Sequence, residues 1–258
     1  MSKTALVTGA TAGIGASFAR FLASKGYDLV LVARDEARLR ENAQMLKAEF
    51  GVTSEILRAD LANTQELKLV EDRIKSTTNP IDVLINNAGF GINKSFLLSD
   101  VDAEQQLLDV LVKTPMRLMH AVLPIMKSRN TGIIINVSSV AAWMAGGSYS
   151  AAKSYLTVLS ESLHTELGGT NVKVLALCPG FTRTEFHQRG RMRMSSLPNF
   201  MWLNADRIVA KAWGDAIKNR AISIPGWQYA ILSSVTRFGP RPLVRKLGMN
   251  IRVKQREK

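Results

Sequence analysis

Residues 8–15 read Thr-Gly-Ala-Thr-Ala-Gly-Ile-Gly and lie between a short apolar run, Thr4–Thr8, and a helical pattern. Gly9 permits a tight turn, Gly13 lets the backbone approach a pyrophosphate, and Gly15 lets a helix pack closely on a sheet. Exposed N–H groups and the helix dipole favour a phosphate anion at such a place. Three glycines alone are also ordinary turn chemistry, but at a strand-to-helix junction they predict a dinucleotide-binding turn.

Short β-type runs alternate with longer helical patterns along the rest of the chain. We expect strands at Thr4–Thr8, Leu29–Ala33, Ser54–Ala59, Val83–Asn86, Ile133–Val137, Lys173–Leu177 and Ala221–Ile224. We expect helices at about 14–25, 36–49, 64–77, 103–128, 150–168 and 206–219. Several strands are almost continuously apolar, as suits strands covered on both faces. The alternation predicts an α/β fold with a doubly wound parallel β-sheet.

Length and composition suit one α/β domain, which we place at residues 1–225 of the 258. Cys178 is the sole cysteine, so no intramolecular disulfide can form and we expect an intracellular, cytoplasmic protein. The N-terminus lacks the pattern of a signal peptide. No apolar run reaches the ~18 residues typical of a membrane-spanning helix.

Residues 226–258 are predicted to be a basic C-terminal extension. The net charge is +13, and residues 237–258 alone carry eight basic residues and one acid. A solvated tail is the simplest interpretation, and peripheral contact with an anionic membrane or an acidic partner is the alternative. The tail has few aromatic residues and no recognised nucleic-acid motif, so we expect no specific nucleic-acid partner.

The end of the second predicted strand bears on cofactor choice. A site for NAD usually offers a carboxylate to the ribose 2′-hydroxyl at the position that Ala33 occupies here. Arg34 follows, and a guanidinium suits a 2′-phosphate. Arg34 could instead begin the next helix and face water. We expect NADPH or NADP to be the cofactor rather than NADH.

Tyr149 and Lys153 are four residues apart and therefore share one face of a helix. A nearby ammonium favours the phenolate and lowers the pKa of a tyrosine from its usual ~10, so that the phenol can act in proton transfer. Ser139 follows the fifth predicted strand and can donate a hydrogen bond to a carbonyl oxygen. Ser138 is the alternative, because neighbouring side chains on a strand point to opposite faces.

The chain resembles the classical short-chain dehydrogenase/reductase family over about residues 3–225. Four motifs carry the resemblance: residues 8–15, Asp60-Leu61, Asn86-Asn87-Ala88-Gly89 and Tyr149-Ser150-Ala151-Ala152-Lys153. Each is moderately specific, and together, in this order, they are strong evidence. The resemblance implies a Rossmann-type domain and an NADP-dependent oxidoreductase.

The resemblance also implies roles for single residues. Asp60 would bind the adenine amino group, Leu61 would pack beside the ring, and Thr184 would contact the nicotinamide carboxamide. Lys153 would also bind the nicotinamide ribose. The predicted catalytic set is Ser139, Tyr149 and Lys153, and the predicted cofactor-binding set is Gly9, Thr11, Ala12, Gly13, Ile14, Gly15, Arg34, Asp60, Leu61, Asn87, Ala88, Gly89, Tyr149, Lys153, Pro179, Gly180, Thr182 and Thr184.

Two features depart from the family pattern. Ser139 and Tyr149 are ten residues apart, a shorter interval than usual, so we expect a trimmed loop at 140–148. Leu111 stands where the family usually has an asparagine that supports a water-linked proton relay. Leucine cannot hold that water, although Asp109 or Lys113 could compensate. This departure motivates the alternative of a weakly catalytic NADPH-binding sensor or scaffold.

More than twenty residues from Phe181 to Asn204 lack clear periodicity, and we expect a substrate lid at about 181–205. Its methionines and aromatic residues suggest an adaptable apolar pocket for a small hydrophobic ketone or aldehyde: a 3-oxoacyl thioester, a steroid-like ketone or another lipid carbonyl. No His/Cys/Asp cluster has metal-ligand spacing, so we expect no metal. The family implies a homo-oligomer, a dimer or tetramer, paired through the helices at 103–128 and 150–168.

Overall fold

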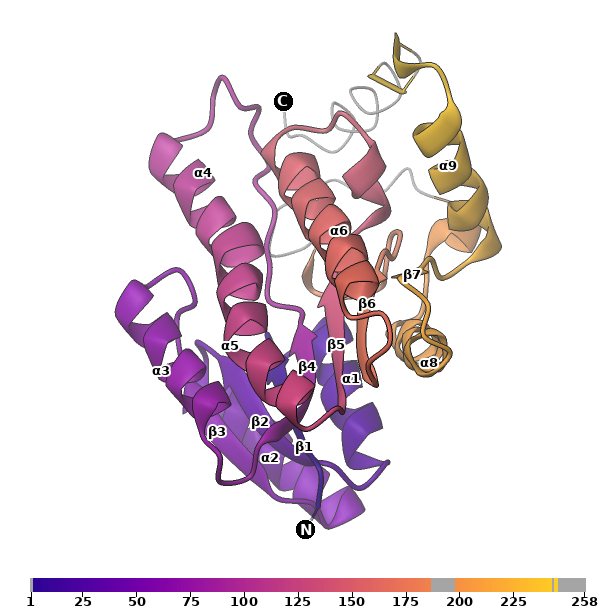
Figure 1. The fold of residues 1–258 in the computed structure, drawn as a ribbon. Helices are drawn as coiled ribbons and strands as arrows, with labels where there is room; N and C mark the ends of the chain where they lie inside the picture. Colours follow the sequence, from indigo (N-terminus) through magenta and orange to yellow (C-terminus); the bar gives the residue numbers. More distant parts are fainter. Residues whose placement is uncertain (1, 187–197, 243, 246–258) are drawn as a thin grey trace.

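The fold is a single parallel sheet with helices on both faces (Figure 1). The computed structural model describes residues 2–186, 198–242 and 244–245. The strands are β1 (Thr4–Thr8), β2 (Asp28–Ala33), β3 (Ser54–Arg58), β4 (Ile81–Asn86), β5 (Gly132–Val137), β6 (Val172–Leu177) and β7 (Ile222–Ser223). Their order is β3-β2-β1-β4-β5-β6-β7, and all neighbours are parallel. The predicted doubly wound sheet is confirmed.

The chain runs outward from β1 to β3 and then returns to the other side of β1 with β4. The sheet therefore has a switch point between β1 and β4. In open sheets of this kind, ligands bind in the crevice beyond the carboxyl ends of the strands at such a point. This topology places the end of β1, with its glycine-rich turn, at the centre of the molecule.

The helices form two layers. They are α1 (Gly13–Ala23), α2 (Glu36–Phe50), α3 (Thr64–Lys75), α4 (Val101–Leu108), α5 (Thr114–Ser128), α6 (Ser148–Glu166), α8 (Ala205–Ile217) and α9 (Trp227–Phe238). The first core cluster joins α1, α2 and α8 to one face of the sheet through residues such as Phe18 and Val209. The second joins α3, α5 and α6 to the other face through Leu67, Leu118 and Leu156. Both strand faces are buried, which explains the continuous apolar strands.

Local signals in the sequence fix several helix ends. The Asn63 side chain accepts hydrogen bonds from the backbone N–H groups of Gln65 and Glu66 and so caps α3. Asp35 caps α2 by accepting from the Arg38 N–H. Gly51 ends α2 with a φ of 71°, a conformation that glycine adopts without a steric penalty.

The helical stretch predicted at 103–128 is confirmed, but it contains a π-helical turn at Asp109–Lys113, between α4 and α5, that was not predicted. Pro115 lacks the N–H that would bond the Leu111 carbonyl four residues earlier in a regular helix. The Thr114 hydroxyl also donates to the Leu61 carbonyl, at 2.9 Å, and holds the start of α5 against the end of β3. The missing N–H of Pro115 and the contact made by Thr114 account for the π-helical turn at this place.

Part of the predicted C-terminal extension is helix α9, which packs against the rest of the fold. Tyr229 is fully buried, and its hydroxyl accepts from the Phe181 N–H at 3.0 Å and donates to the Met201 carbonyl at 2.6 Å. Its ring fills the space beside Gly180, where a Cβ would lie 2.1 Å from it. The domain boundary at 225 stays a prediction. Residues 187–197 of the predicted lid at 181–205, and residues 243 and 246–258 of the predicted extension, lie outside the described residues.

No helix in the described ranges is both long enough and apolar enough to cross a membrane. The predicted pairing of copies is untested and stays a prediction. Exposed apolar side chains, Met116, Tyr155 and Val158, do lie on the two helices that it would use, α5 and α6.

We expect Tyr229→Phe to lower the free energy of unfolding by about 1–3 kcal/mol, because it removes a hydroxyl that pairs with two backbone groups in the interior. Urea denaturation measures this change. Tyr155→Phe is the matched control, because Tyr155 is exposed on α6, and we expect little change from it. Equal stabilities for the two variants would contradict this role of Tyr229.

Candidate active site

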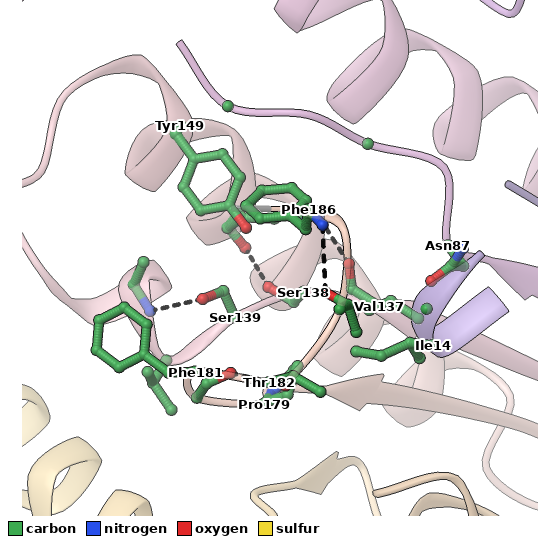
Figure 2. A pocket seen from close by; sticks show the side chains of 18 of the residues that line it. Ile14, Asn87, Val137, Ser138, Ser139, Tyr149, Pro179, Phe181, Thr182 and Phe186 are labelled. Carbon is green, nitrogen blue, oxygen red and sulfur yellow. Dashed lines mark hydrogen bonds between the residues drawn. The ribbon is translucent and has the colours of Figure 1, made fainter. Parts of the chain in front are cut away.

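A cavity of about 300 Å³ opens beyond the carboxyl ends of the central strands (Figure 2). Its walls come from the turn after β1, the ends of β4, β5 and β6, helix α6 and helix α9. Most of the predicted site residues meet here: Gly9, Thr11, Ala12, Gly13, Ile14, Asn87, Ala88, Gly89, Ser139, Tyr149, Lys153, Pro179, Gly180, Thr182 and Thr184. The structure thus brings the motifs into one site, while the role of each residue stays a prediction.

The glycine-rich turn leaves room for a phosphate. Gly9 and Gly13 have φ values of 66° and 57°, which disfavour a side chain. A Cβ at Gly15 would lie 2.2 Å from the Gly9 carbonyl oxygen, so only glycine lets α1 approach the turn this closely. Helix α1 has Ala12 at its N-cap and therefore no side-chain cap for its first N–H groups. These features fit the diphosphate of a dinucleotide.

Asn87 holds the turn in place. Its Nδ2 donates to the carbonyls of Thr8, at 2.9 Å, and Gly9, at 3.2 Å. The backbone N–H groups of Asn87 and Ala88 both donate to the Thr8 hydroxyl, at 2.9 and 3.1 Å. These contacts tie the end of β4 to the end of β1, so Asn87 positions the phosphate turn whatever else it contacts.

Tyr149 lies in the first turn of α6, half-buried at the wall of the cavity, with its ring centroid 6.0 Å from that of Phe186 (Figure 2). Burial raises the pKa of Tyr149 to about 12, and hydrogen bonding with Ser139 offsets this only in part. The predicted lowering of this pKa by Lys153 is therefore wrong for the protein without cofactor. The reason is that the phenolate would have to form away from water.

Lys153 lies one turn further along α6, and its Nζ is 5.7 Å from the centre of the Tyr149 ring. The ammonium donates to the Val137 carbonyl at the end of β5, at 2.7 Å. Burial lowers the pKa of Lys153 to about 8. The ammonium thus bonds a backbone carbonyl as well as facing the ring. This shared contact reduces the extent to which it lowers the pKa of the phenol.

The two serines after β5 have different surroundings. Ser138 is buried, and its hydroxyl lies 2.8 Å from the Lys153 carbonyl and 2.7 Å from the Thr157 hydroxyl, so it helps to fix α6. The Ser139 hydroxyl accepts from the Ala141 N–H at 3.1 Å, which leaves its own proton to donate. This geometry favours Ser139 over Ser138 as the group that meets a substrate carbonyl.

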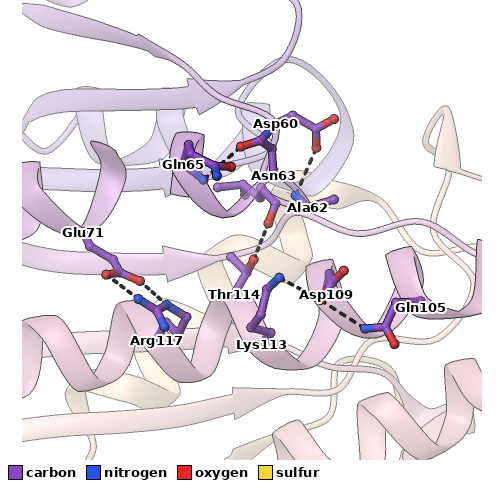
Figure 3. A network of polar contacts seen from close by, with 11 residues as sticks. Asp60, Ala62, Asn63, Gln65, Glu71, Gln105, Asp109, Lys113, Thr114 and Arg117 are labelled. Atoms are coloured by element: carbon purple, nitrogen blue, oxygen red, sulfur yellow. Dashed lines mark hydrogen bonds and ion pairs between the residues drawn. The ribbon is translucent and has the colours of Figure 1, made fainter. Parts of the chain in front are cut away.

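Leu111 lies in the π-helical turn, almost wholly buried, and its Cδ2 is 2.8 Å from where a Cβ on Gly89 would be. The leucine therefore fills the space beside the cavity with apolar atoms. Lys113 and Asp109 pair with each other at 2.7 Å (Figure 3), and neither lines the cavity. This geometry therefore does not support the idea that Asp109 or Lys113 compensates for the missing asparagine.

Four predicted cofactor residues lie outside the cavity: Gly15 in the first turn of α1, and Arg34, Asp60 and Leu61 at the ends of β2 and β3. Arg34 is exposed and has no carboxylate partner among the described residues. The Asp60 carboxylate accepts from the Ala62 N–H at 3.0 Å, and Leu61 packs in the core with its carbonyl bonded to Thr114 (Figure 3). Strands β2 and β3 continue the sheet beyond β1. Arg34, Asp60 and Leu61 therefore lie further along the same edge of the sheet than the phosphate turn.

The cavity lining includes Phe186, which belongs to the predicted lid, and further residues that the sequence did not single out. Phe186 and Glu185 come just after the Thr182–Thr184 segment, and Glu185 pairs with Arg38 at the start of α2, at 3.0 Å. Tyr229 and Leu232 come from α9, which had been assigned to the tail. The helical spacing of Tyr229, Leu232 and Thr236, which face inward, is the signal in the sequence for that helix.

The described parts of the chain contain no group of three or more His, Cys, Asp or Glu side chains that could hold a metal ion. The expectation of no metal therefore stays a prediction, because residues 187–197 and the tail are not described.

The chain matches known proteins over most of its length. The profile of the short chain dehydrogenase family matches residues 3–194. A curated relative, the ketoacyl reductase HetN of Nostoc sp. (strain PCC 7120), is 32% identical over 240 residues, which is 92% of this chain and 82% of that one.

Two solved structures are similar in sequence and in shape. The short-chain dehydrogenase from Sphingobium yanoikuyae in complex with NADPH is 33% identical with a TM-score of 0.83, covering 90% of this chain and 93% of that one. The bulky-bulky ketone specific alcohol dehydrogenase from Comamonas testosteroni is 31% identical with a TM-score of 0.79, covering 90% and 91%.

The buried Lys153 makes the stability of the protein depend on pH. Its pKa is about 8 in the folded protein and ~10.4 in an unfolded chain, so between these values the unfolded state binds more protons and the free energy of unfolding rises with pH. We expect Lys153→Met to lose this rise, so that its stability relative to wild type falls by roughly 2–3 kcal/mol from pH ~8 to ~10.5. Urea denaturation at several pH values measures it.

The control is Lys3→Met, which removes an exposed lysine near the start of β1 and keeps the wild-type dependence on pH. A Lys153→Met protein with the same dependence on pH as wild type would show that the ammonium is not perturbed by burial.

Proposed function

The chain belongs to the short-chain dehydrogenase family, and on that premise we propose that it is an NADPH-dependent reductase of a bulky hydrophobic ketone, with Tyr149 as proton donor. The observation that supports this most strongly is the meeting of the phosphate turn, Ser139, Tyr149 and Lys153 around one cavity. The enzyme class follows from the family, while substrate and residue roles are part of the proposal.

NADPH fits the residues at the phosphate turn and at the end of β2. The uncapped start of α1, with Gly13 at its first position, would hold the diphosphate. The exposed Arg34 would bind the 2′-phosphate, for which a guanidinium is suited. The relative from Sphingobium yanoikuyae, which was solved with NADPH, supports the same choice.

The side chains of this site suit the reduction of a carbonyl. Bound NADPH supplies the hydride. The Ser139 hydroxyl would donate a hydrogen bond to the carbonyl oxygen and stabilise the charge that develops there. Tyr149, whose raised pKa keeps it protonated, would give its phenolic proton to that oxygen. The Lys153 ammonium would then stabilise the phenolate and bind the nicotinamide ribose.

An apolar substrate suits the lining of the cavity beyond these polar groups. Phe181, Phe186, Tyr229 and Leu232 contribute aromatic and aliphatic surface, and Met144 adds an adaptable thioether. The trimmed loop before α6 forms one wall of the space. A ketone with bulky groups on both sides would bury these surfaces, and the Comamonas testosteroni enzyme, which is specific for such ketones, supports this class.

A weakly catalytic NADPH-binding sensor is the second candidate, and Leu111 favours it. The side chain fills the position beside Gly89 where the family pattern has a polar residue, so a proton reaching Lys153 would need another path. This candidate predicts NADPH binding without turnover, whereas the reductase predicts both.

We expect Tyr149→Phe to reduce NADPH oxidation with a bulky aryl ketone by about 10²–10⁴-fold, because it removes the proton donor. The fluorescence of bound NADPH measures cofactor affinity, which we expect to change little. Tyr155→Phe, on the exposed side of the same helix, is the control and retains turnover. NADPH binding with no turnover by wild type on a broad panel of carbonyls would favour the sensor.

We expect Arg34→Ala to weaken NADPH binding by roughly 10–100-fold and to leave NADH binding nearly unchanged, because only NADPH carries the 2′-phosphate. Isothermal titration calorimetry measures both affinities. Arg40→Ala removes a guanidinium from the same helix region, where Arg40 pairs with Glu36, and serves as the control for net charge. An equal loss for the two cofactors would show that Arg34 does not read the 2′-phosphate.

A further inference from the structure

Helix α9 exposes an apolar stripe to solvent. Trp227, Ile231, Val235 and Phe238 recur at intervals of three or four residues, which places them on one side of the helix. They are 71%, 58%, 55% and 83% exposed. A surface helix normally turns its apolar side to the core and its charged side to water. Helix α9 has a buried side as well, and the exposed stripe therefore needs another explanation.

The stripe continues beyond the start of the helix. Phe200 is exposed, and its carbonyl accepts a hydrogen bond from the Gln228 side chain at 3.0 Å. This contact places the short segment around Phe200 beside the first turn of α9, next to Trp227. We refer to Phe200, Trp227, Ile231, Val235 and Phe238 together as the α9 patch. Contiguous apolar surface of this kind marks a site of interaction with a protein or a membrane.

Positive charge adjoins the C-terminal end of the α9 patch. Arg237, Arg241 and Arg245 are exposed there. The Arg237 guanidinium lies 5.3 Å from the centre of the Trp143 ring and 5.7 Å from that of Phe238, and 3.9 Å from the Glu161 carboxylate. From Trp227 to Arg245, within the described residues of this region, the sequence has three arginines and no acidic residue. The patch therefore combines exposed apolar side chains with an excess of cations.

We propose that the α9 patch docks on an anionic lipid bilayer, with α9 lying in the plane of the interface. Apolar side chains with a tryptophan among them enter the boundary between headgroups and acyl chains, while arginines bind anionic headgroups. Each basic residue near such a surface adds to the attraction. A second copy of this chain fits less well as the occupant, because two such faces would bring their arginines together.

Docking would place the bilayer beside the substrate cavity. The opposite side of α9 contributes Tyr229 and Leu232 to the lining of that cavity. A hydrophobic carbonyl compound dissolved in the bilayer would thus reach the cavity without passing through bulk water. This consequence rests on the function proposed above, whereas the docking itself does not.

Cosedimentation with lipid vesicles tests the proposal on the full chain. We expect binding to vesicles that contain phosphatidylglycerol, weak binding to phosphatidylcholine alone, and a loss of binding as salt rises, since salt screens the charges. Ile231→Ser with Val235→Ser removes part of the stripe, and Arg241→Gln with Arg245→Gln removes charge. We expect each double variant to bind the anionic vesicles about tenfold more weakly.

The chain offers a matched control. Leu97 and Leu98 are even more exposed, but they lie beside Asp100 and Asp102 rather than beside arginines. Leu97→Ser with Leu98→Ser should leave vesicle binding unchanged. The proposal is overturned if wild type does not bind anionic vesicles, if both α9 variants bind as wild type does, or if the control loses as much. Binding to poly-glutamate but not to vesicles would assign the patch to an acidic protein and would also overturn it.

A separate readout distinguishes this proposal from the proposed function. NADPH binding and the reduction of a water-soluble ketone should be unchanged in the α9 variants, because their substituted side chains do not line the cavity. Vesicle binding without any turnover by wild type would contradict the reductase and leave the docking surface intact.

Discussion

The Lys153 ammonium donates to the Val137 carbonyl inside the protein, and this contact ties α6 to the end of β5. Ser138 supports the same junction through the Lys153 carbonyl. Because α6 is fixed there, Tyr149 is held one turn earlier, above the carboxyl ends of the central strands. The cost of this arrangement is burial, which lowers the pKa of the lysine and raises that of the tyrosine. A half-buried phenol with a raised pKa keeps its proton at neutral pH and is a weaker acid than a free tyrosine, so donation to a carbonyl oxygen would depend on Lys153 stabilising the phenolate that forms.

The remaining parts of the site are built around the same edge of the sheet. Asn87 ties the glycine-rich turn to β4, so the turn and the reacting groups belong to one rigid framework. Helix α9 adds the opposite wall through Tyr229, whose hydroxyl anchors the segment after β6. One helix therefore completes the apolar cavity with one side and presents an exposed apolar stripe with the other. Under the two proposals above, this helix would connect a hydrophobic substrate to a lipid phase.

Periodicity and turn residues predicted the sheet, its parallel order and most helices, because apolar strands and caps such as Asn63 act locally. The same reasoning predicted that the motif residues meet in one crevice. It missed the π-helical turn before Pro115, where a lost backbone donor acts together with the distant contact from Thr114 to Leu61. It missed α9 because burial of Tyr229 depends on a partner, Gly180, that is far away in sequence. It gave the wrong direction for the pKa of Tyr149, because spacing reveals the neighbouring charge but not the depth of burial.

The central claim is that burial outweighs the charge of Lys153 and keeps Tyr149 protonated in the protein without cofactor. Ultraviolet difference titration of wild type against Tyr149→Phe measures the ionisation of this one phenol directly. The account predicts no phenolate signal from Tyr149 up to about pH 10, since its pKa is raised to about 12. A phenolate half formed at or below about pH 9 would contradict it, because the ammonium would then dominate over burial.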